Sequence, residues 1–295
     1  MHPVIQNLYQ DYLTAVLTAH LPERGVAWLR GKLATLTSEK ELYLAFSLAP
    51  RFTGKAPLAL TESQLQQARQ LRPGFNPAGW TADQAARTLL LLLAPHHSPA
   101  EYTALLGRLF GTANLEELGT LYAALPLLPY PENYVMRAAE GVRTATTSVF
   151  DAIALNNPYP HDYLPQEAWN QMILKAVFNA RPLHLIHGLD DRRNEPLARM
   201  LLDYAHERWA AGRTLTPEVW RLVGPYLTAD TLSDVQRLLR SDNALQVQAG
   251  TLALAESSLP EARDLLSQLA PRGPAAAKGE QVSSWQRIGE QAYLA

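Results

Sequence analysis

The feature that most constrains this chain is a succession of short amphipathic segments, many of them ended by a proline. In each segment apolar residues recur at i, i+3 and i+4, which places them on one face of an α-helix. Ends are predicted at Pro50, Pro95 and Pro129, because proline removes a backbone donor and opposes helix continuation. Their spacing falls in the range of helical-hairpin repeats. The alternating β-branched pattern of strands is absent. We therefore predict an all-α protein of stacked antiparallel helical hairpins, in a HEAT-like α-solenoid.

Helix starts are predicted from capping residues. In a capping box, a Ser or Thr side chain accepts from the backbone three residues on, and a Glu or Gln there reaches back. Ser98 adds the combination of an N-cap and a proline at the first helical position. The pairs with capping-box spacing are Ser38 with Glu41, Thr61 with Gln64, and Thr81 with Gln84.

The domain organisation follows from the same pattern. Residues 1–270 are predicted to form a single α-helical repeat domain, whose end at 226–270 has the short Ala- and Leu-rich helices of HEAT-like repeats. Residues 271–295 are predicted to be a flexible tail, because its first part is rich in Pro, Gly and Ala. A short amphipathic helix from Trp285 onward either docks on the body or binds a partner.

Composition excludes several classes of protein. The net charge of −2 indicates neither a nucleic-acid nor an anionic-lipid partner. The chain has no cysteine, so disulfides, thiolate metal sites and a cysteine nucleophile are excluded. No signal-peptide pattern opens the sequence, and its longest apolar run, 89–95, is too short to insert in a membrane. We expect a cytoplasmic location.

Polar residues at helical spacing mark residues 140–208 as the predicted functional region. They stand among large apolar residues, where charges must be paired or must serve a ligand. The three predicted helical stripes are Glu140, Thr144, Thr147 and Asp151; Gln171, Lys175 and Asn179; and Arg199, Asp203 and His206 with Glu207 beside them.

If these helices pack as neighbours, their stripes converge on one polar pocket. We predict that Asp151 and Lys175 lie in it, with Asp203 and His206 on its wall, and these four are the candidates for acid–base catalysis. Guanidinium groups grip phosphate and amides recognise hydroxyls, so the pocket would suit a phosphorylated or polyhydroxylated small molecule. The other predicted ligand-binding residues are Arg143, Thr147, Asn156, Asn157, Arg181, Arg192, Asn194 and Glu207.

Structural interpretations compete with this one. A charged stripe is also typical of a solvated helix face, and Arg143, Asp151, Lys175 and Asp203 could form internal ion pairs. His184, His187 and Asp190 have the composition of a weak metal site, but the same residues fit an exposed helix end. No P-loop, dinucleotide fingerprint or metalloprotease motif is present, so the sequence indicates no particular cofactor.

Several longer sequence motifs resemble the EboA family of bacteria, over a family core at about 74–225. They are FNPAGWTADQAARTLLLL, RTATTSVFDAIALNNPYP, WNQMILKAVF, GLDDR, ARMLLDYAHERWAAGR and WRLVGP.

The resemblance implies an accessory or scaffold protein of the ebo pathway of metabolite biosynthesis and export, a branch of secondary metabolism, with other ebo-cluster proteins as partners. In cyanobacteria it implies a link to moving precursors of the pigment scytonemin. The resemblance identifies no catalytic residue in this sequence. The alternative is a metal-assisted or acid–base enzyme acting on a cyclitol- or sugar-like pathway intermediate.

Overall fold

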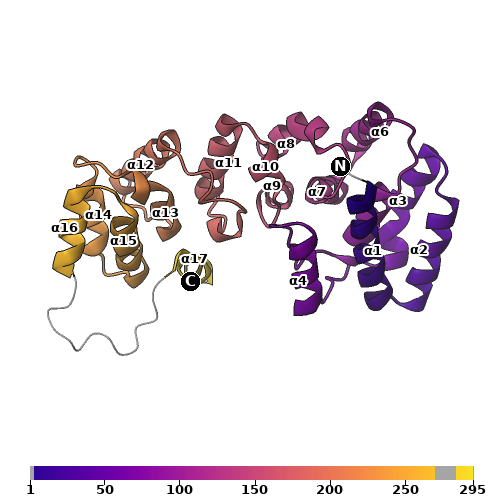
Figure 1. Ribbon diagram of the computed structural model, residues 1–295, viewed down its shortest axis with the longest axis horizontal. Helices are drawn as coiled ribbons and strands as arrows, with labels where there is room; N and C mark the ends of the chain where they lie inside the picture. Colours follow the sequence, from indigo (N-terminus) through magenta and orange to yellow (C-terminus); the bar gives the residue numbers. More distant parts are fainter. Residues whose placement is uncertain (1–2, 270–283, 295) are drawn as a thin grey trace. The chain divides into compact units, whose positions relative to one another are not determined.

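The computed structural model describes residues 3–269 and 284–294, and every regular element in these ranges is a helix (Figure 1). Their one β-type contact is an isolated bridge between Pro57 and Thr81. The prediction of an all-α protein is confirmed. None of the described helices combines the length and the apolar character needed to cross a membrane.

The chain forms two compact units, unit 1 at Met1–Ala168 and unit 2 at Trp169–Ala295. The single repeat domain over 1–270 stays a prediction. The helices of unit 1 are α1 Pro3–His20, α2 Glu23–Thr35, α3 Glu39–Thr53, α4 Glu62–Leu71, α5 Ala82–Leu92, α6 Pro99–Thr112, α7 Leu115–Ala124, η1 Pro131–Tyr134, α8 Val135–Gly141, α9 Thr147–Ala154 and α10 Tyr159–Tyr163.

Helix α5 is the centre of unit 1. It packs against α1, α3 and α7, and each of its residues except Gln84 is buried. A helix enclosed on all sides must be apolar around most of its circumference, as the run at 89–92 is. Because α5 contacts helices far away in the sequence, packing in unit 1 is not restricted to successive hairpins. The HEAT-like solenoid therefore stays a prediction.

A buried arginine and its acidic partners lie inside this helix cluster. Arg87 of α5 is 2% exposed, and its NH1 donates to Asp83 Oδ2 at 2.9 Å. Its NH2 lies 3.6 Å from Glu117 Oε1, and its Nε donates to the backbone oxygen of Phe46 at 2.9 Å. The guanidinium is thus matched by two carboxylates and a carbonyl, which a buried charge requires.

The contact to Phe46 explains why a predicted helix end is wrong. Pro50 has no N–H to donate to the oxygen of Phe46 four residues earlier, and Arg87 donates to that oxygen instead. Helix α3 therefore continues through Pro50 and ends at Thr53. There the Thr53 hydroxyl bonds back to the oxygen of Ala49 at 2.9 Å.

The predicted caps at Ser38, Thr61 and Ser98 all form. Thr61 makes both halves of the capping box with the glutamine three residues on. The box predicted at Thr81 is wrong, although α5 does begin at the next residue. Its hydroxyl donates to Asp83 Oδ1 at 2.6 Å, so it orients the carboxylate that pairs with Arg87.

The first predicted polar stripe is broken. Helix α8 ends at Gly141, where a Cβ atom would lie 2.5 Å from the ring of Tyr122, and α9 begins only at Thr147. Between them the N–H of Thr146 donates to Thr144 Oγ1 at 3.2 Å, a local turn that replaces the helix. The prediction of one continuous helical face is wrong for its members Glu140, Thr144, Thr147 and Asp151.

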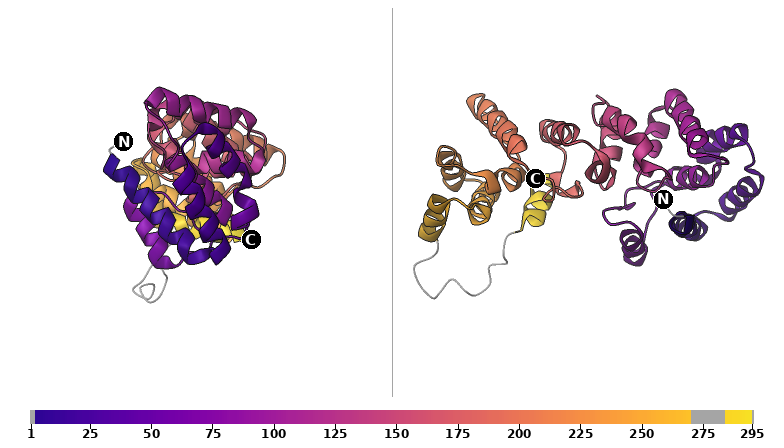
Figure 2. Two further views of the ribbon diagram at one scale, coloured as in Figure 1. Left: turned by 90° about the vertical axis from the view of Figure 1, so that its right-hand side faces the viewer. Right: turned by 45° about the horizontal axis from the view of Figure 1, so that its top comes forward.

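Unit 2 begins within α11 Gln166–Phe178. Its centre is α15, which packs against α13, α14, α16 and α17 (Figures 1 and 2). At Gly224 a Cβ would lie 2.8 Å from the Cα of Ala253, so glycine permits this close approach. The further elements are η2 Leu183–Leu185, α12 Glu195–Ala210, η3 Pro217–Val219, α13 Trp220–Val223, η4 Gly224–Tyr226, α14 Leu232–Leu239, α15 Ala244–Glu256, α16 Pro260–Leu269 and α17 Trp285–Leu294.

Helix α17 is the short amphipathic helix that the sequence suggests after Trp285. It docks on unit 2, against α15, η2 and η3. Ile288 is fully buried there, and Trp285 Nε1 donates to Glu256 Oε1 at 2.6 Å. The flexible segment predicted at 271–280 lies outside the described residues.

Candidate functional site

The predicted site residues of unit 1 occupy three different environments. Arg143 and Thr147 are exposed, and Arg143 Nε donates to the oxygen of Ala139 at 2.9 Å. Asp151 is half-buried on α9. Arg143 thus bonds within its own segment, in the way that solvated cations near a helix end do.

The two predicted amides of unit 1 hold the chain that follows α9. Asn157 is buried, and its Nδ2 donates to the oxygens of Tyr122 and Ala152, each at 3.0 Å. Its Oδ1 accepts from the N–H of Tyr159 at 3.0 Å, so each of its polar atoms has a partner. Asn156, at a φ of 54°, accepts at its Oδ1 from an amide of the loop before α5. The hydrogen bonds of these two asparagine side chains are therefore part of the fold of unit 1.

In unit 2 the predicted residues before α12 also lie in different environments. Lys175 of α11 is half-buried, and burial lowers its pKa. The guanidinium of Arg192 lies 4.8 Å from the centre of the Trp169 ring. Asn194 caps α12 by accepting from a backbone N–H, and its amide exchanges hydrogen bonds with Asn170. Arg181, just after α11, is half-buried.

On α12 the third predicted stripe forms. Asp203, His206 and Glu207 lie on one helix and are exposed, as is Arg199. His206 Nε2 lies 2.9 Å from Asp234 Oδ2 of α14, so this imidazole links two helices. The predicted meeting of Asp151 from unit 1 with Lys175, Asp203 and His206 from unit 2 stays a prediction.

The weak metal candidates have other neighbours in unit 2. The N–H of His184 donates to Glu218 Oε1 at 2.5 Å, and its ring Nδ1 lies 3.3 Å from the same oxygen. Asp190 accepts two hydrogen bonds from Arg221, at 2.6 and 2.5 Å, while His187 is half-buried. In residues 3–269 and 284–294, no three His, Asp or Glu side chains gather as a metal site would require.

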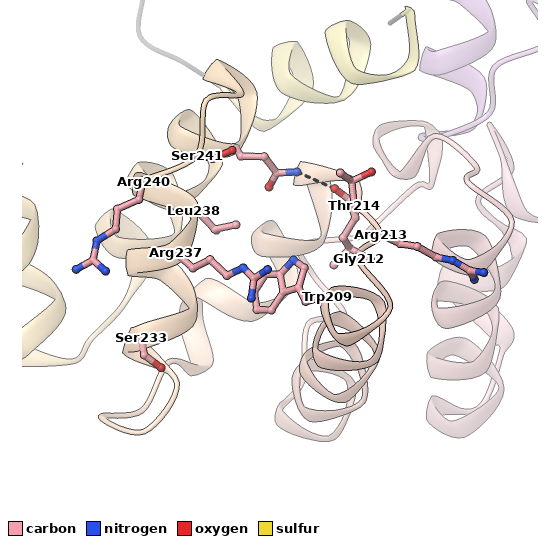
Figure 3. A pocket seen from close by; sticks show the side chains of 11 residues that line it. Trp209, Gly212, Arg213, Thr214, Ser233, Arg237, Leu238, Arg240 and Ser241 are labelled. Carbon is pink, nitrogen blue, oxygen red and sulfur yellow. Dashed lines mark hydrogen bonds between the residues drawn. The ribbon is translucent and has the colours of Figure 1, made fainter.

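A cavity of about 530 Å³ in unit 2 brings together a different set of residues (Figure 3). It lies where the end of α12 and the loop at 211–216 face α14 and the start of α15. We call it the cationic cavity. Its polar and aromatic lining is Trp209, Arg213, Thr214, Ser233, Arg237, Arg240, Ser241 and Gln246.

At its centre Arg237 folds over the ring of Trp209, with 4.4 Å from its Cζ to the ring centre (Figure 3). The ring of Trp209 stacks in turn on buried Trp220, at 5.8 Å and 15°. Arg213 and Arg240 extend to opposite sides of this pair. Among the described residues, none of the three arginines forms an ion pair with a carboxylate.

The loop wall of the cationic cavity is fixed by hydrogen bonds to its backbone. Arg208 donates from Nε and NH2 to the oxygen of Thr214, at 3.2 and 3.0 Å. Gln246 Nε2 of α15 donates to the oxygen of Leu215 at 2.7 Å. Gly212 turns the chain there with a φ of +66°. A loop held in this way does not have to become ordered when a ligand binds, which favours binding.

Sequence reasoning missed this cavity because it looked for charges among bulky apolar residues. Arg237 and Arg240 lie in a segment interpreted as plain HEAT-like helices, and Arg213 follows a glycine in a loop. The sequence signal for this cavity was the excess of arginines over acidic residues at 208–213 and 237–240, together with the aromatic residue Trp209. Chemically, guanidinium groups flanked by hydroxyls bind anions.

A comparison with known protein families matches residues 9–224 to the family described as "Metabolite traffic protein EboA". No curated protein and no solved structure matches the chain. The matched residues include the α12 and loop walls of the cationic cavity, from Trp209 to Leu215, while α14 and α15 follow the matched range. A match over so much of the sequence assigns the family, and the resemblance noted from the sequence is confirmed. The chain belongs to the EboA family of metabolite traffic proteins.

Proposed function

We propose that this protein binds a small anionic metabolite in the cationic cavity and acts as a non-enzymatic accessory protein of metabolite traffic. The observation that supports this is Arg237, held over Trp209 with no carboxylate partner among the described residues. A guanidinium in this state offers its N–H donors to a phosphate or carboxylate. The hydroxyls of Thr214 and Ser233 on the lining suit a phosphorylated or polyhydroxylated molecule.

Binding fits the lining better than catalysis does. The cavity of about 530 Å³ has a volume typical of small-molecule sites. Its lining contains no histidine, lysine or carboxylate, so it holds no group that could act as a general base near neutral pH. A carrier needs to hold its cargo and release it unchanged, and Arg237 with the hydroxyls of the lining is sufficient for that.

The family description, a metabolite traffic protein, supports the proposal that this binding serves the handling of metabolites. We propose that other ebo-cluster proteins supply or receive the bound molecule, which co-purification with tagged protein would test. The enzyme alternative uses Asp203 and His206 as an acid–base pair. The contact of His206 with Asp234 favours a structural role for this imidazole instead, because the contact joins α12 to α14.

The experiment is titration calorimetry of the full chain with glucose 6-phosphate, and with glucose as the neutral counterpart. We expect the phosphate ester to bind and glucose to bind far more weakly. Arg237→Gln should weaken binding about tenfold or more, the loss expected when one charged hydrogen-bond donor is removed. The matched control is Arg263→Gln, an exposed arginine on α16 of the same unit that lies outside the cavity.

Two results would overturn the proposal. One is the absence of measurable binding of glucose 6-phosphate to the wild-type chain. The other is equal affinity of Arg237→Gln, Arg263→Gln and wild type, because the anion would then bind elsewhere.

A further inference from the structure

A second cavity, of about 370 Å³, adjoins the cationic cavity in unit 2. The two share Thr214, Leu215, Ser241 and Gln246, so the loop at 211–216 and the start of α15 line both. Five apolar or aromatic residues of the second cavity come from α11, α12, α15 and α17. They are Val177, Phe178, Tyr204, Leu245 and Ala292.

Phe178 is the most unusual residue of this lining. It is 70% exposed, and its ring lies 6.3 Å from that of Tyr204. The exposed ring of Phe178 is in contact with water, and removing apolar surface from water is favourable. A molecule that covers this ring therefore gains affinity. Arg208 also lines the second cavity, but its guanidinium is bonded to the oxygen of Thr214.

The shared wall is firm. The bond from Gln246 Nε2 to the oxygen of Leu215 connects α15 to the loop, and Arg208 holds the preceding residue from the other side. A ligand can therefore lie along this wall without having to order it. Next to these shared residues the cationic cavity offers Arg237, and the second cavity offers aromatic and aliphatic side chains.

We propose that the two cavities form one two-part site for an amphipathic anion, with a phosphate group beside Arg237 and an apolar portion against Phe178 and Tyr204. This inference rests on the proposed function and narrows it, because it names the chemical class of the cargo. A compact sugar phosphate would occupy only the cationic cavity. A molecule with a hydrocarbon or aromatic portion would use both.

The test compares hexyl phosphate with inorganic phosphate by calorimetry on the full chain. Wild type should bind hexyl phosphate at least about tenfold more tightly, the gain from burying roughly two methylene groups. Phe178→Ser should reduce this advantage several-fold while leaving the affinity for inorganic phosphate unchanged. Arg237→Gln should weaken both ligands. Met136→Ser is the matched control, since Met136 is 71% exposed on α8 of unit 1 and lines neither cavity.

Each contrary outcome has a distinct meaning. Equal affinity of wild type for hexyl phosphate and inorganic phosphate would overturn the two-part site and leave the proposed function standing. An advantage of hexyl phosphate that Phe178→Ser and Met136→Ser leave equally unchanged would also overturn it. Failure of both phosphates and of glucose 6-phosphate to bind would overturn the proposed function itself.

Discussion

Arg87 in unit 1 and Arg237 in unit 2 make the same contact in opposite surroundings. Each guanidinium lies over an aromatic ring, Arg87 at 5.2 Å from the centre of Phe46 and Arg237 at 4.4 Å from that of Trp209. Arg87 is buried and matched by two carboxylates and a carbonyl, whereas Arg237 is exposed and has no carboxylate partner among the described residues. A cation held on a ring is therefore structural where acceptors surround it, and able to bind a ligand where they do not.

The helices that carry the two arginines explain the difference. Helix α5 is enclosed by α1, α3 and α7, so every polar group on it must find a partner within unit 1. Helix α14 buries only Val235 and Leu238. Arg237 lies on the exposed side of this helix, where it lines the cationic cavity. Burial requires Arg87 to be paired, whereas exposure leaves the N–H groups of Arg237 available to solvent or to a ligand.

The largest expected effect is that of Arg87→Met. It leaves Asp83, Glu117 and the oxygen of Phe46 buried without their cation, which should lower the free energy of unfolding by about 3–5 kcal/mol. Urea denaturation followed by circular dichroism measures it. The control is Arg69→Gln, which removes an exposed pair with Glu62 and should cost less than about 1 kcal/mol. Equal losses for the two variants would show that burial does not distinguish these ion pairs.

The next largest effect concerns the docking of α17 in unit 2. A Cβ at Gly289 would lie 2.5 Å from both Glu218 Oε1 and His184 Nδ1, so glycine is what permits this close approach. Gly289→Val should cost about 1–3 kcal/mol, as overpacking does. Hydrogen exchange should show faster exchange of the α17 amides, with α5 of unit 1 unaffected. Unchanged protection of α17 would contradict this packing.

Much of the fold was predictable because it depends on local signals. The caps at Ser38, Thr61 and Ser98 and the apolar periodicity depend on neighbours three or four residues away, which the sequence displays directly. The helix end predicted at Pro50 failed because it depends on a distant partner: Arg87, far along the chain, takes over the oxygen of Phe46. The cap at Thr81 failed for a local reason, because its hydroxyl donates to Asp83, two residues on.

The candidate site was less predictable for the same reason. Helical spacing correctly placed Asp203 and His206 together on α12, but periodicity does not reveal a break such as the turn at Thr144. It also gives no information on which loop will face which helix. The meeting of Trp209 with Arg237 depends on how α12 packs near α14, and the sequence contains no local signal for that packing.

A smaller, pH-dependent effect is expected at Glu218, a buried carboxyl of unit 2. Burial raises the pKa of its carboxyl above 4.5, although the N–H groups of Leu183 and His184 oppose the shift. A raised folded-state pKa means that its contribution to stability is fully present below pH 4.5 and is lost as pH rises through the folded-state pKa.

Melting temperatures of wild type and Glu218→Gln, measured from pH 4.5 to 7.5, test this sign. The advantage of wild type over the variant should shrink as pH rises, because only wild type has to ionise a buried carboxyl. An advantage that grows with pH would show that the backbone donors outweigh burial. Glu218 would then resemble Arg87, as a buried charge whose partners fully compensate it.

The smallest expected effect on stability is that of Arg237→Gln, and the comparison of the two arginines depends on it. An exposed cation–ring contact contributes about 0.5–1 kcal/mol, so the variant should lose no more than that, against several kcal/mol for Arg87→Met. For the stabilisation that a bound ligand gives, Arg237 should matter more than Arg87. Saturating glucose 6-phosphate should raise the melting temperature of wild type, because binding stabilises only the folded state, and should have little effect on Arg237→Gln. Arg87→Met should still show the ligand-induced rise from its lower starting temperature, since its cavity residues in unit 2 are intact. A large loss of stability in Arg237→Gln without ligand would mean that this arginine, too, is structural.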